Sequence, residues 1–360
     1  MNGVSSRLAP SFLPTTAVLE VTGRCNHACL FCSCPWYRAG GVYETGPELT
    51  TREWKGVLDK LCSMGVVNVA FTGGEAMMRD DLRELMEHAA GLQAEYIETR
   101  QGGLVSSRKA PRLYLLTNGR LFTREWMEWC RVQGVQPSFS LPGLTAFSEL
   151  TGHDGADQVL QCFSWARELG VSAVANITVT RLNLHELERT LVAALAAGAR
   201  QVLLNRFLPG GRGLAHAERL ELDADGVRGM LEVAEDTLAR AGAFGNVGTE
   251  LPRCLVPERK FTHLEVGSRC SAAQGFFVVG PEGRVRVCNH SETQLARVQE
   301  IEQVKNDEYW KLFAFRRYAP PCRMECAKGN GCDAGCREAM HIVEGNVSAP
   351  DRLAVPVRSI

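Results

Sequence analysis

The chain has 360 residues, with 40 Lys and Arg against 41 Asp and Glu, for a net charge of −1. This balance gives no electrostatic basis for binding nucleic acid, and no apolar run approaches the roughly 18 residues of a membrane-spanning helix. The amino terminus lacks the basic-then-apolar pattern of a secretion signal. We therefore expect a cytoplasmic protein, whose 14 Cys residues act as metal ligands rather than disulfides.

Strands and helices alternate after a polar leader at residues 1–15. Short apolar runs predict strands at 17–21, 66–71, 113–116, 137–141, 172–179 and 201–207. The first predicted helix begins at a Thr50–Glu53 capping box and ends at Gly65. Further helices are predicted over 81–90, 124–133, 156–169 and 184–197, the last capped by Asn183 and ended by Gly198. Residues 91–112 form one long polar insertion.

Six strand–helix units indicate a parallel α/β sheet that right-handed crossovers curl toward a barrel. A full eight-unit barrel needs about 250 residues, but here the alternation ends near residue 242. The sequence therefore predicts an open partial (β/α)6 TIM-like barrel and a small, separate cysteine-rich domain. The expected divisions are a leader at 1–15, the barrel at 16–215, a helical linker at 216–250, the cysteine-rich domain at 251–345 and a tail at 346–360.

Three cysteines follow the first strand with the spacing C-x3-C-x2-C: Cys25, Cys29 and Cys32. Three thiolates can hold a four-iron cluster while one iron keeps no protein ligand. Zinc sites usually pair C-x2-C knuckles with a nearby fourth ligand, and a loop this tight should turn His27 outward. The spacing therefore favours an iron–sulfur cluster over zinc. Cys34, just beyond, is interpreted as a spare thiol.

The second strand ends at Thr72-Gly73-Gly74-Glu75, where glycines let backbone groups approach a ligand and Glu75 can receive an ammonium. Placed one βα unit after the cysteine triplet, this motif resembles the radical S-adenosylmethionine (SAM) enzymes of the SPASM/twitch branch. The resemblance covers roughly residues 16–340. It implies that the triplet binds a 4Fe–4S cluster and that SAM lies beside it.

The same resemblance implies the SAM contacts at the strand ends. For two of them, on the fourth and fifth strands, a plain strand-end hydrogen bond is the alternative interpretation. A guanidinium on the sixth strand suits the SAM carboxylate by its fork geometry. The expected contacts are Phe31 (adenine), Gly73, Gly74 and Glu75 (methionyl amine), Ser140 (ribose or carboxylate), Asn176, and Arg206 (carboxylate). Ala76 and Pro142 depart from the family pattern, which usually has Pro and Asp there.

A second cysteine array lies near the carboxyl terminus. Its first pair, Cys270-x12-Gly283-x4-Cys288, encloses a predicted hairpin that turns at Pro281-Glu282-Gly283. Its second part reads Cys322-x3-Cys326-x5-Cys332-x3-Cys336. Zinc is the alternative ligand, but the spacing resembles the SPASM domain and implies auxiliary 4Fe–4S clusters.

Two assignments of the auxiliary ligands stay open at this point. By resemblance, the first cluster would use Cys254, Cys270, Cys288 and Cys336. The second would use Cys322, Cys326 and Cys332, together with an open iron or a ligand such as His341 or Asp351. A one-cluster, twitch-like arrangement would instead use Cys270, Cys288, Cys322 and Cys326.

The reaction implied by the resemblance is reductive cleavage of SAM to a 5′-deoxyadenosyl radical, which abstracts a substrate hydrogen. Auxiliary clusters would accept the electron left on the substrate, so net oxidation is expected, with a reductant such as flavodoxin or ferredoxin. Related enzymes use an Asp after the cysteine that closes the hairpin. Here the segment reads Cys288-Asn289-His290, so His290 is the expected base.

A ribosomal peptide or protein side chain is the favoured substrate. Since the first strand begins near residue 17, we expect no amino-terminal leader-recognition domain. A peptide would then need a separate recognition protein, or would dock directly against the insertion at 91–112. The alternatives are a small-molecule tailoring dehydrogenase or epimerase acting on a sugar, cyclitol or nucleoside, and a non-enzymatic iron–sulfur carrier.

Overall fold

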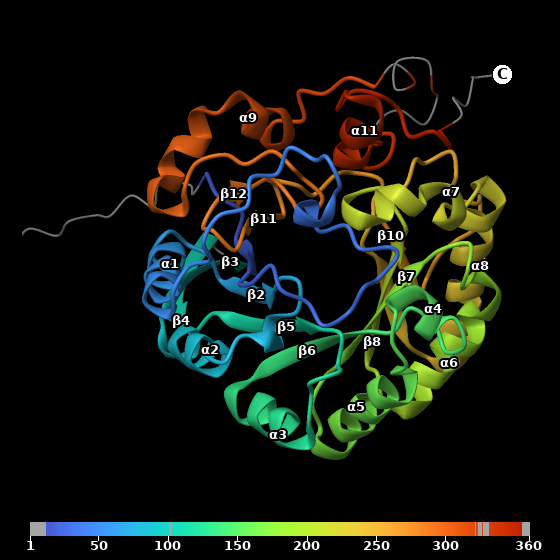
Figure 1. The fold of residues 1–360 in the computed structure, drawn as a ribbon, viewed down its shortest axis with the longest axis horizontal. Coiled ribbons are helices and arrows are strands. Elements are labelled where there is room, and N and C mark those ends of the chain that lie inside the picture. The colour runs from blue at the N-terminus through green and yellow to red at the C-terminus, as the bar shows by residue number, and fades with distance from the viewer. Residues whose placement is uncertain (1–11, 101–102, 321, 323–325, 327–330, 355–360) are drawn as a thin grey trace, which may run out of the picture.

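The computed structural model describes residues 12–100, 103–320, 322, 326 and 331–354. Its centre is one sheet with the strand order β10-β9-β8-β7-β6-β5-β2-β1-β11-β12. Figure 1 shows these strands arranged around the middle of the molecule, with the helices on the outer circumference. In the described residues no helix is both long and apolar enough to cross a lipid bilayer.

The six predicted strands form the parallel part of this sheet. They are β1 (Thr16–Glu20), β2 (Asn68–Thr72), β5 (Arg112–Thr117), β6 (Val135–Ser140), β7 (Val174–Val179) and β8 (Gln201–Arg206). Every neighbouring pair among them is parallel. Because parallel strands end at the same edge of a sheet, the loops that carry the predicted site converge there. The predicted α/β partial-barrel fold is confirmed.

The crossover helices agree closely with the sequence pattern. Two of them, α3 (Arg124–Gln133) and α5 (Ala156–Leu169), have the predicted bounds. The Thr50–Glu53 capping box is formed in full. Asn183 does not cap the helix after it; its side-chain oxygen accepts the Thr180 N–H at 2.7 Å instead. The other helices of this part are α1 (Thr51–Ser63), α2 (Leu82–Gly91), α4 (Phe147–Thr151), α6 (Leu187–Ala197), α7 (Ala217–Leu220) and α8 (Ala224–Ala241).

The polar insertion is an antiparallel hairpin rather than a loop. Its strands are β3 (Ala94–Arg100) and β4 (Gly103–Lys109). The Tyr96 hydroxyl donates to the Val67 carbonyl at 3.1 Å and the Ala110 carbonyl at 2.9 Å. Val67 immediately precedes β2, so the hairpin is anchored at the amino end of that strand, opposite the edge where the site loops converge.

The sheet also continues beyond the expected end of the alternation. Four further strands join it: β9 (Phe244–Val247), β10 (Leu264–Val266), β11 (Phe276–Val279) and β12 (Val285–Arg286). β9 extends the sheet beyond β8, and β11 pairs in parallel with β1. The segment after residue 250 was expected to be separate; it shares the main sheet instead. The predicted hairpin between Cys270 and Cys288 is formed by β11 and β12.

The sheet buries two large apolar clusters. One surrounds β1, β2, β5 and β6, and the other lies between β8, α6 and α8. Cys62, Cys130 and Cys162 are buried thiols, as their places on helix faces predict. The remaining elements are the helices α9 (Glu308–Ala314) and α11 (Arg337–Glu344), and the 3-10 segments η1 (Pro35–Tyr37), η2 (Ala76–Met78), η3 (Leu184–Glu186), η4 (Gly211–His216) and η5 (Val298–Asn306).

Candidate active site

A cavity of about 480 Å³ lies where the strand ends converge. All seven predicted SAM contacts line it, as do the three cysteines of the amino-terminal triplet. The carboxyl-terminal part of the chain contributes His290 and three cysteines of the second array to the same cavity: Cys270, Cys288 and Cys336. Residues more than 300 positions apart therefore meet in one cavity.

The loop after β1 is fixed to the glycine motif after β2. The Gly74 N–H donates to the Thr22 carbonyl at 2.8 Å, and the Glu75 N–H donates to the Arg24 carbonyl at 2.8 Å. A side chain at Gly74 would collide with the Arg24 carbonyl. Glycine is required here because backbone lies against backbone, and this contact sets the position from which the triplet begins.

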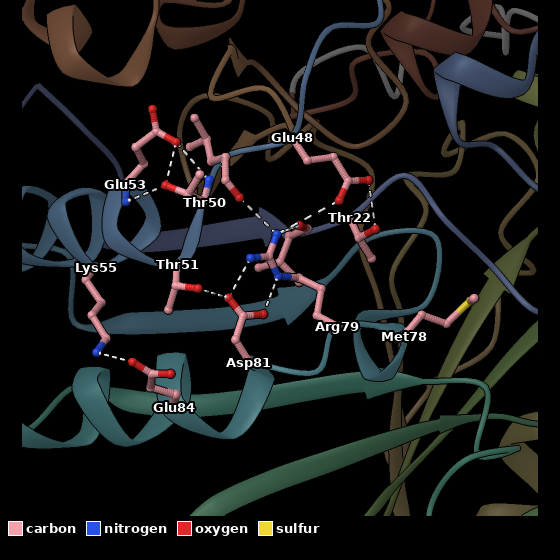
Figure 2. A network of polar contacts seen from close by, with 12 residues as sticks. Thr22, Glu48, Thr50, Thr51, Glu53, Lys55, Met78, Arg79, Asp81 and Glu84 are labelled. Atoms are coloured by element: carbon pink, nitrogen blue, oxygen red, sulfur yellow. Dashed lines mark hydrogen bonds and ion pairs between the residues drawn. The ribbon is translucent and has the colours of Figure 1, made fainter.

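Arg79, whose side chain is 9% exposed, supports the same loop (Figure 2). It forms two hydrogen bonds with the Asp81 carboxylate, at 2.8 and 2.6 Å, and donates to the Val21 carbonyl at 3.0 Å. The nearby Glu48 carboxylate accepts the Thr22 hydroxyl at 2.8 Å. The segment before Cys25 is thus held by charged partners from two other loops.

Arg212 is a cation whose charge lowers the pKa of all three thiols of the triplet. It donates to the Cys29 carbonyl at 3.3 Å, and its guanidinium lies 4.6 Å from the centre of the Tyr37 ring. Burial raises the pKa of the Cys25 and Cys29 thiols, and Arg212 opposes that effect at both. Sequence reasoning gave Arg212 no role. A cation directly after the Gly210-Gly211 pair was the available signal.

Cys34 is not the spare thiol that the sequence suggested. A hydrogen bond from Cys34 lowers the pKa of Cys32 to about 7, against the opposing effect of burial. The Cys34 thiol also lies 3.8 Å from the Gly73 carbonyl and lines the cavity. It therefore connects the triplet to the glycine motif.

Glu75 is buried and already well bonded. Its carboxylate accepts the Thr117 hydroxyl at 2.8 Å, the Asn118 N–H at 2.7 Å and the Met77 N–H at 3.1 Å. Burial raises its pKa, and these three donors oppose that shift. A carboxylate has about four acceptor positions, so one is left toward the cavity. Asn118, which sequence reasoning missed, also donates to the Asn26 side chain at 2.7 Å.

His27 is buried, so the expectation that the tight loop turns it outward is wrong. Its ring centre lies 5.2 Å from that of His153 and 6.3 Å from that of Phe147. Burial, with His153 as the next cause, lowers its pKa to about 4. A neutral imidazole therefore packs beneath the triplet. The contact of the His27 ring with Phe147 of α4 makes this inward position favourable.

Arg206 lines the cavity, but its charge is already partnered. Both guanidinium NH2 groups donate to the Asp351 carboxylate, and the two side chains are 5% and 3% exposed. The Arg206 Nε atom is buried and lacks a hydrogen-bond partner in the described residues. That N–H remains available to an acceptor in the cavity. Asp351, considered above as a cluster ligand, is occupied by this ion pair.

The cysteines of the second array fall into two groups. Cys270 and Cys288 flank the β11–β12 hairpin, and Cys336 lies at the start of α11, all three on the cavity wall. Cys254 belongs elsewhere: the neighbouring Arg253 N–H donates to the Cys332 thiol at 3.4 Å.

Electrostatics gives the same grouping. The pKa of Cys322 is raised by burial first, then by Cys332, with Cys254 and Cys326 as smaller causes and Arg337 opposing them. The structure therefore places Cys254 beside the second predicted set rather than the first. In the described residues, no three His, Cys, Asp or Glu side chains lie close enough together to hold a single metal ion.

The cavity wall also carries the predicted base, His290, and a carboxylate that the sequence did not reveal. His290 contacts the Pro209 carbonyl through Nε2 at 3.0 Å, and burial lowers its pKa. Glu20, at the end of β1, accepts the Asn289 side chain at 3.2 Å and pairs with Arg286. An acidic residue ending an apolar strand was the signal for Glu20.

The sequence of this chain is similar to those of known proteins. The radical SAM superfamily matches residues 19–194. The PqqA peptide cyclase of Rhodopseudomonas palustris is 28% identical over 365 residues, covering 96% of this chain and 88% of that protein. The AdoMet-dependent heme synthase of Oleidesulfovibrio alaskensis is 29% identical over 358 residues, covering 93% and 85%.

Solved structures share the fold. Streptococcus suis SuiB bound to S-adenosylmethionine superposes with a TM-score of 0.70 at 17% identity, covering 95% of this chain and 77% of that one. Native anSMEcpe with bound AdoMet gives a TM-score of 0.68 at 14% identity, covering 94% and 92%. Because the matched segment contains both the cysteine triplet and the glycine motif, we conclude that residues 19–194 form a radical SAM domain.

Proposed function

We propose that this chain is a radical SAM oxidoreductase of the SPASM/twitch type that modifies a peptide side chain. It would generate a 5′-deoxyadenosyl radical, remove a substrate hydrogen and pass the remaining electron to auxiliary iron–sulfur clusters. The observation that carries the proposal is the shared cavity. Its walls include the amino-terminal triplet, the predicted SAM contacts and the first group of the second array.

The residues at the triplet suit a 4Fe–4S cluster with SAM. Three thiols come from one loop, a cation offsets the burial of two of them, and glycines leave room for a ligand. When bound there, the cluster and SAM supply the electron transfer and the radical chemistry. Cys25, Cys29 and Cys32 would hold three irons, and the unpaired Nε of Arg206 suits the SAM carboxylate.

The remaining wall residues would position the substrate and exclude water. Glu75 would orient the methionyl ammonium through its remaining acceptor position. Ser140 and Asn176, at the ends of β6 and β7, are adjacent in register and line the cavity. His290 stays the proposed base, since it lines the cavity beside Cys288.

For the auxiliary site we propose two groups. Cys270, Cys288 and Cys336 would bind one cluster beside the substrate cavity, because they line its wall. The second group would lie behind it and consists of Cys254, Cys322, Cys326 and Cys332. In this arrangement the second cluster has four thiolates and needs neither His341 nor Asp351.

The peptide substrate is supported by the relatives. One is a PqqA peptide cyclase, and SuiB has been solved bound to precursor peptide SuiA. A small molecule is the second candidate, favoured by the similarity to an AdoMet-dependent heme synthase. A short precursor-peptide gene beside this gene would support the first candidate, whereas tetrapyrrole or sugar-modifying genes would support the second.

The central test measures iron and SAM cleavage together. We expect anaerobically reconstituted protein to bind about 8–12 irons, and the change of Cys25, Cys29 and Cys32 to Ala to remove about four of them. With dithionite and SAM, the parent should form 5′-deoxyadenosine and the triple variant should form none. Cys62→Ala, which removes a core thiol, is the matched control. Stoichiometric zinc without iron in the parent would contradict the whole proposal.

A second test separates the auxiliary site from the barrel. We expect Cys270→Ala/Cys288→Ala to retain 5′-deoxyadenosine formation while losing iron and oxidised product. Cys322→Ala/Cys332→Ala should lose iron from the other group. If both double variants keep the parent's iron content, the second array is structural and the auxiliary part of the proposal fails.

A further inference from the structure

The group of cysteines beside the cavity provides three thiolates, one fewer than a four-iron cluster accepts. This inference rests on the proposed cluster at Cys270, Cys288 and Cys336. We propose that the Glu338 carboxylate binds the fourth iron of that cluster, through its Oε2 atom.

Glu338 lies in the first turn of α11, two residues after Cys336. Its side chain is only 1% exposed and lines the same cavity as the three cysteines. In the described part of the chain, Oε2 is buried and has no hydrogen-bond partner. A buried carboxylate oxygen without a donor is costly unless it is paired or binds a metal. Here the carboxylate shares its cavity with the thiols of Cys270, Cys288 and Cys336.

The other carboxylate oxygen is held in place. Oε1 accepts the Tyr309 hydroxyl at 2.8 Å, and that hydroxyl also contacts His341 Nδ1 at 2.7 Å. His341 Nδ1 is 3.7 Å from Oε2, within ion-pair range when the imidazole is protonated but beyond hydrogen-bonding distance. One oxygen is therefore anchored and the other is left for a cation. Metal ligands are commonly oriented by such outer partners.

A second carboxylate, Glu250, lies near the same thiols and lines the cavity. It differs in two ways. Its Oε1 atom accepts both the Ser271 N–H and the Ser271 hydroxyl at 3.0 Å, and its side chain is only half-buried. Glu250 therefore has protein donors and access to water, and it serves as the matched control.

The experiment uses the full chain with Cys25, Cys29 and Cys32 changed to Ala, so that only auxiliary clusters contribute to the spectra. Iron per chain and the electron paramagnetic resonance spectra of oxidised and dithionite-reduced protein are then compared. The variants are Glu338→Gln, Glu338→Cys and Glu250→Gln.

We expect Glu338→Gln to lose about one iron per chain and to give an oxidised three-iron signal, because one iron loses its protein ligand. Glu338→Cys should restore the iron content with a changed spectrum, since a thiolate replaces the carboxylate. Glu250→Gln should match the parent. Identical iron and spectra in parent and Glu338→Gln would overturn the proposal, and the same changes in Glu250→Gln would assign the ligand to Glu250 instead.

Tyr309→Phe keeps the inference testable if Glu338→Gln fails to fold. It retains the carboxylate but removes its anchor, so we expect unchanged iron content with shifted resonances, and unshifted resonances would count against Glu338. The cysteine double variants distinguish a failure of the proposed cluster from a failure of its proposed fourth ligand. If Cys270→Ala/Cys288→Ala loses no iron, the cluster itself is wrong, whereas loss there with an unchanged Glu338→Gln rejects only the fourth ligand.

Discussion

The guanidinium of Arg206, at the end of β8, forms a buried ion pair with the carboxylate of Asp351 in the carboxyl-terminal segment. The Asp351 N–H also donates to the Ala334 carbonyl at 3.0 Å, beside the second cysteine array. One carboxylate therefore connects the barrel wall to the segment that carries the carboxyl-terminal cysteines. Arg206 has a structural role in addition to the SAM contact proposed for it.

Asp351→Asn should destabilise the protein by about 3–5 kcal/mol, because it leaves the Arg206 charge buried and unpaired. Chemical denaturation of parent and variant measures this difference. Glu149→Gln is the control, since it breaks the half-exposed pair with Arg219 and surface pairs contribute little. Equal stability of Asp351→Asn and the parent would show that water reaches Arg206.

Glu75→Ala should weaken SAM binding about 10- to 150-fold, the range that corresponds to losing a charge-assisted hydrogen bond. Its iron content should stay at the parent value, because no proposed cluster ligand changes. Equilibrium binding of SAM to reconstituted protein measures the effect. Thr117→Val removes one donor to the carboxylate but keeps its charge, so we expect a smaller loss. Unchanged affinity in Glu75→Ala would remove this residue from the SAM site.

Two glycine-to-alanine changes should have opposite effects. Gly74→Ala places a methyl group against the Arg24 carbonyl, so we expect lower stability and poor iron incorporation at the triplet. Gly56 is exposed within α1 and has open space around it. Gly56→Ala should therefore stabilise the protein by roughly 0.5–1 kcal/mol. Thermal melting and iron analysis test both, and a normally reconstituted Gly74→Ala would mean that the two loops can separate without loss.

A carboxylate far from the cavity should make stability depend on pH. Glu235 in α8 is 3% exposed. Burial alone would raise its pKa, but donors from Thr262, His263 and Leu264 hold the pKa at about 2, below the ordinary value of 4.5. A lowered pKa stabilises the fold above the unfolded value, and that contribution disappears as the pH falls from about 4.5 to about 2.

Glu235→Gln should therefore lower stability at pH 7 by about 1.5–3 kcal/mol and flatten the acid limb of the pH profile. Denaturant titrations between pH 3 and pH 7 measure both quantities. A profile with the same acid limb in parent and variant would refute this origin of the pH dependence.

Sequence patterns correctly predicted the features that depend on residues close together in the chain. The bounds of α3 and α5 follow from the spacing of their apolar residues, Thr50 and Glu53 form the cap, and the triplet and the glycine motif lie on one cavity. These features depend on neighbours within a few positions or on adjacent βα units. The family resemblance added the expected SAM contacts, and all of these residues line that cavity.

Long-range contacts account for what was missed. Cys254 lies near Cys332 because the neighbouring Arg253 N–H donates to the Cys332 thiol, 79 positions along the chain. No motif spacing predicts a contact over that separation. His27 is drawn inward by His153, and Glu338 faces the cavity only because α11 packs beside it. Periodicity also cannot show that β9 and β11 extend a sheet at opposite edges, because each is short and pairs with a distant strand.

The pairing of β1 with β11 sets the spacing between the two proposed cluster sites. Thr16 lies opposite Phe276 and Leu19 opposite Val279, and the triplet follows one strand while Cys270 and Cys288 flank the hairpin formed by the other. A slip of one residue along this ladder would move one metal site relative to the other by about 3.3 Å and turn the side chains to the opposite face. If both proposed clusters are present, the backbone pairing of these two strands would set the distance over which an electron passes between them.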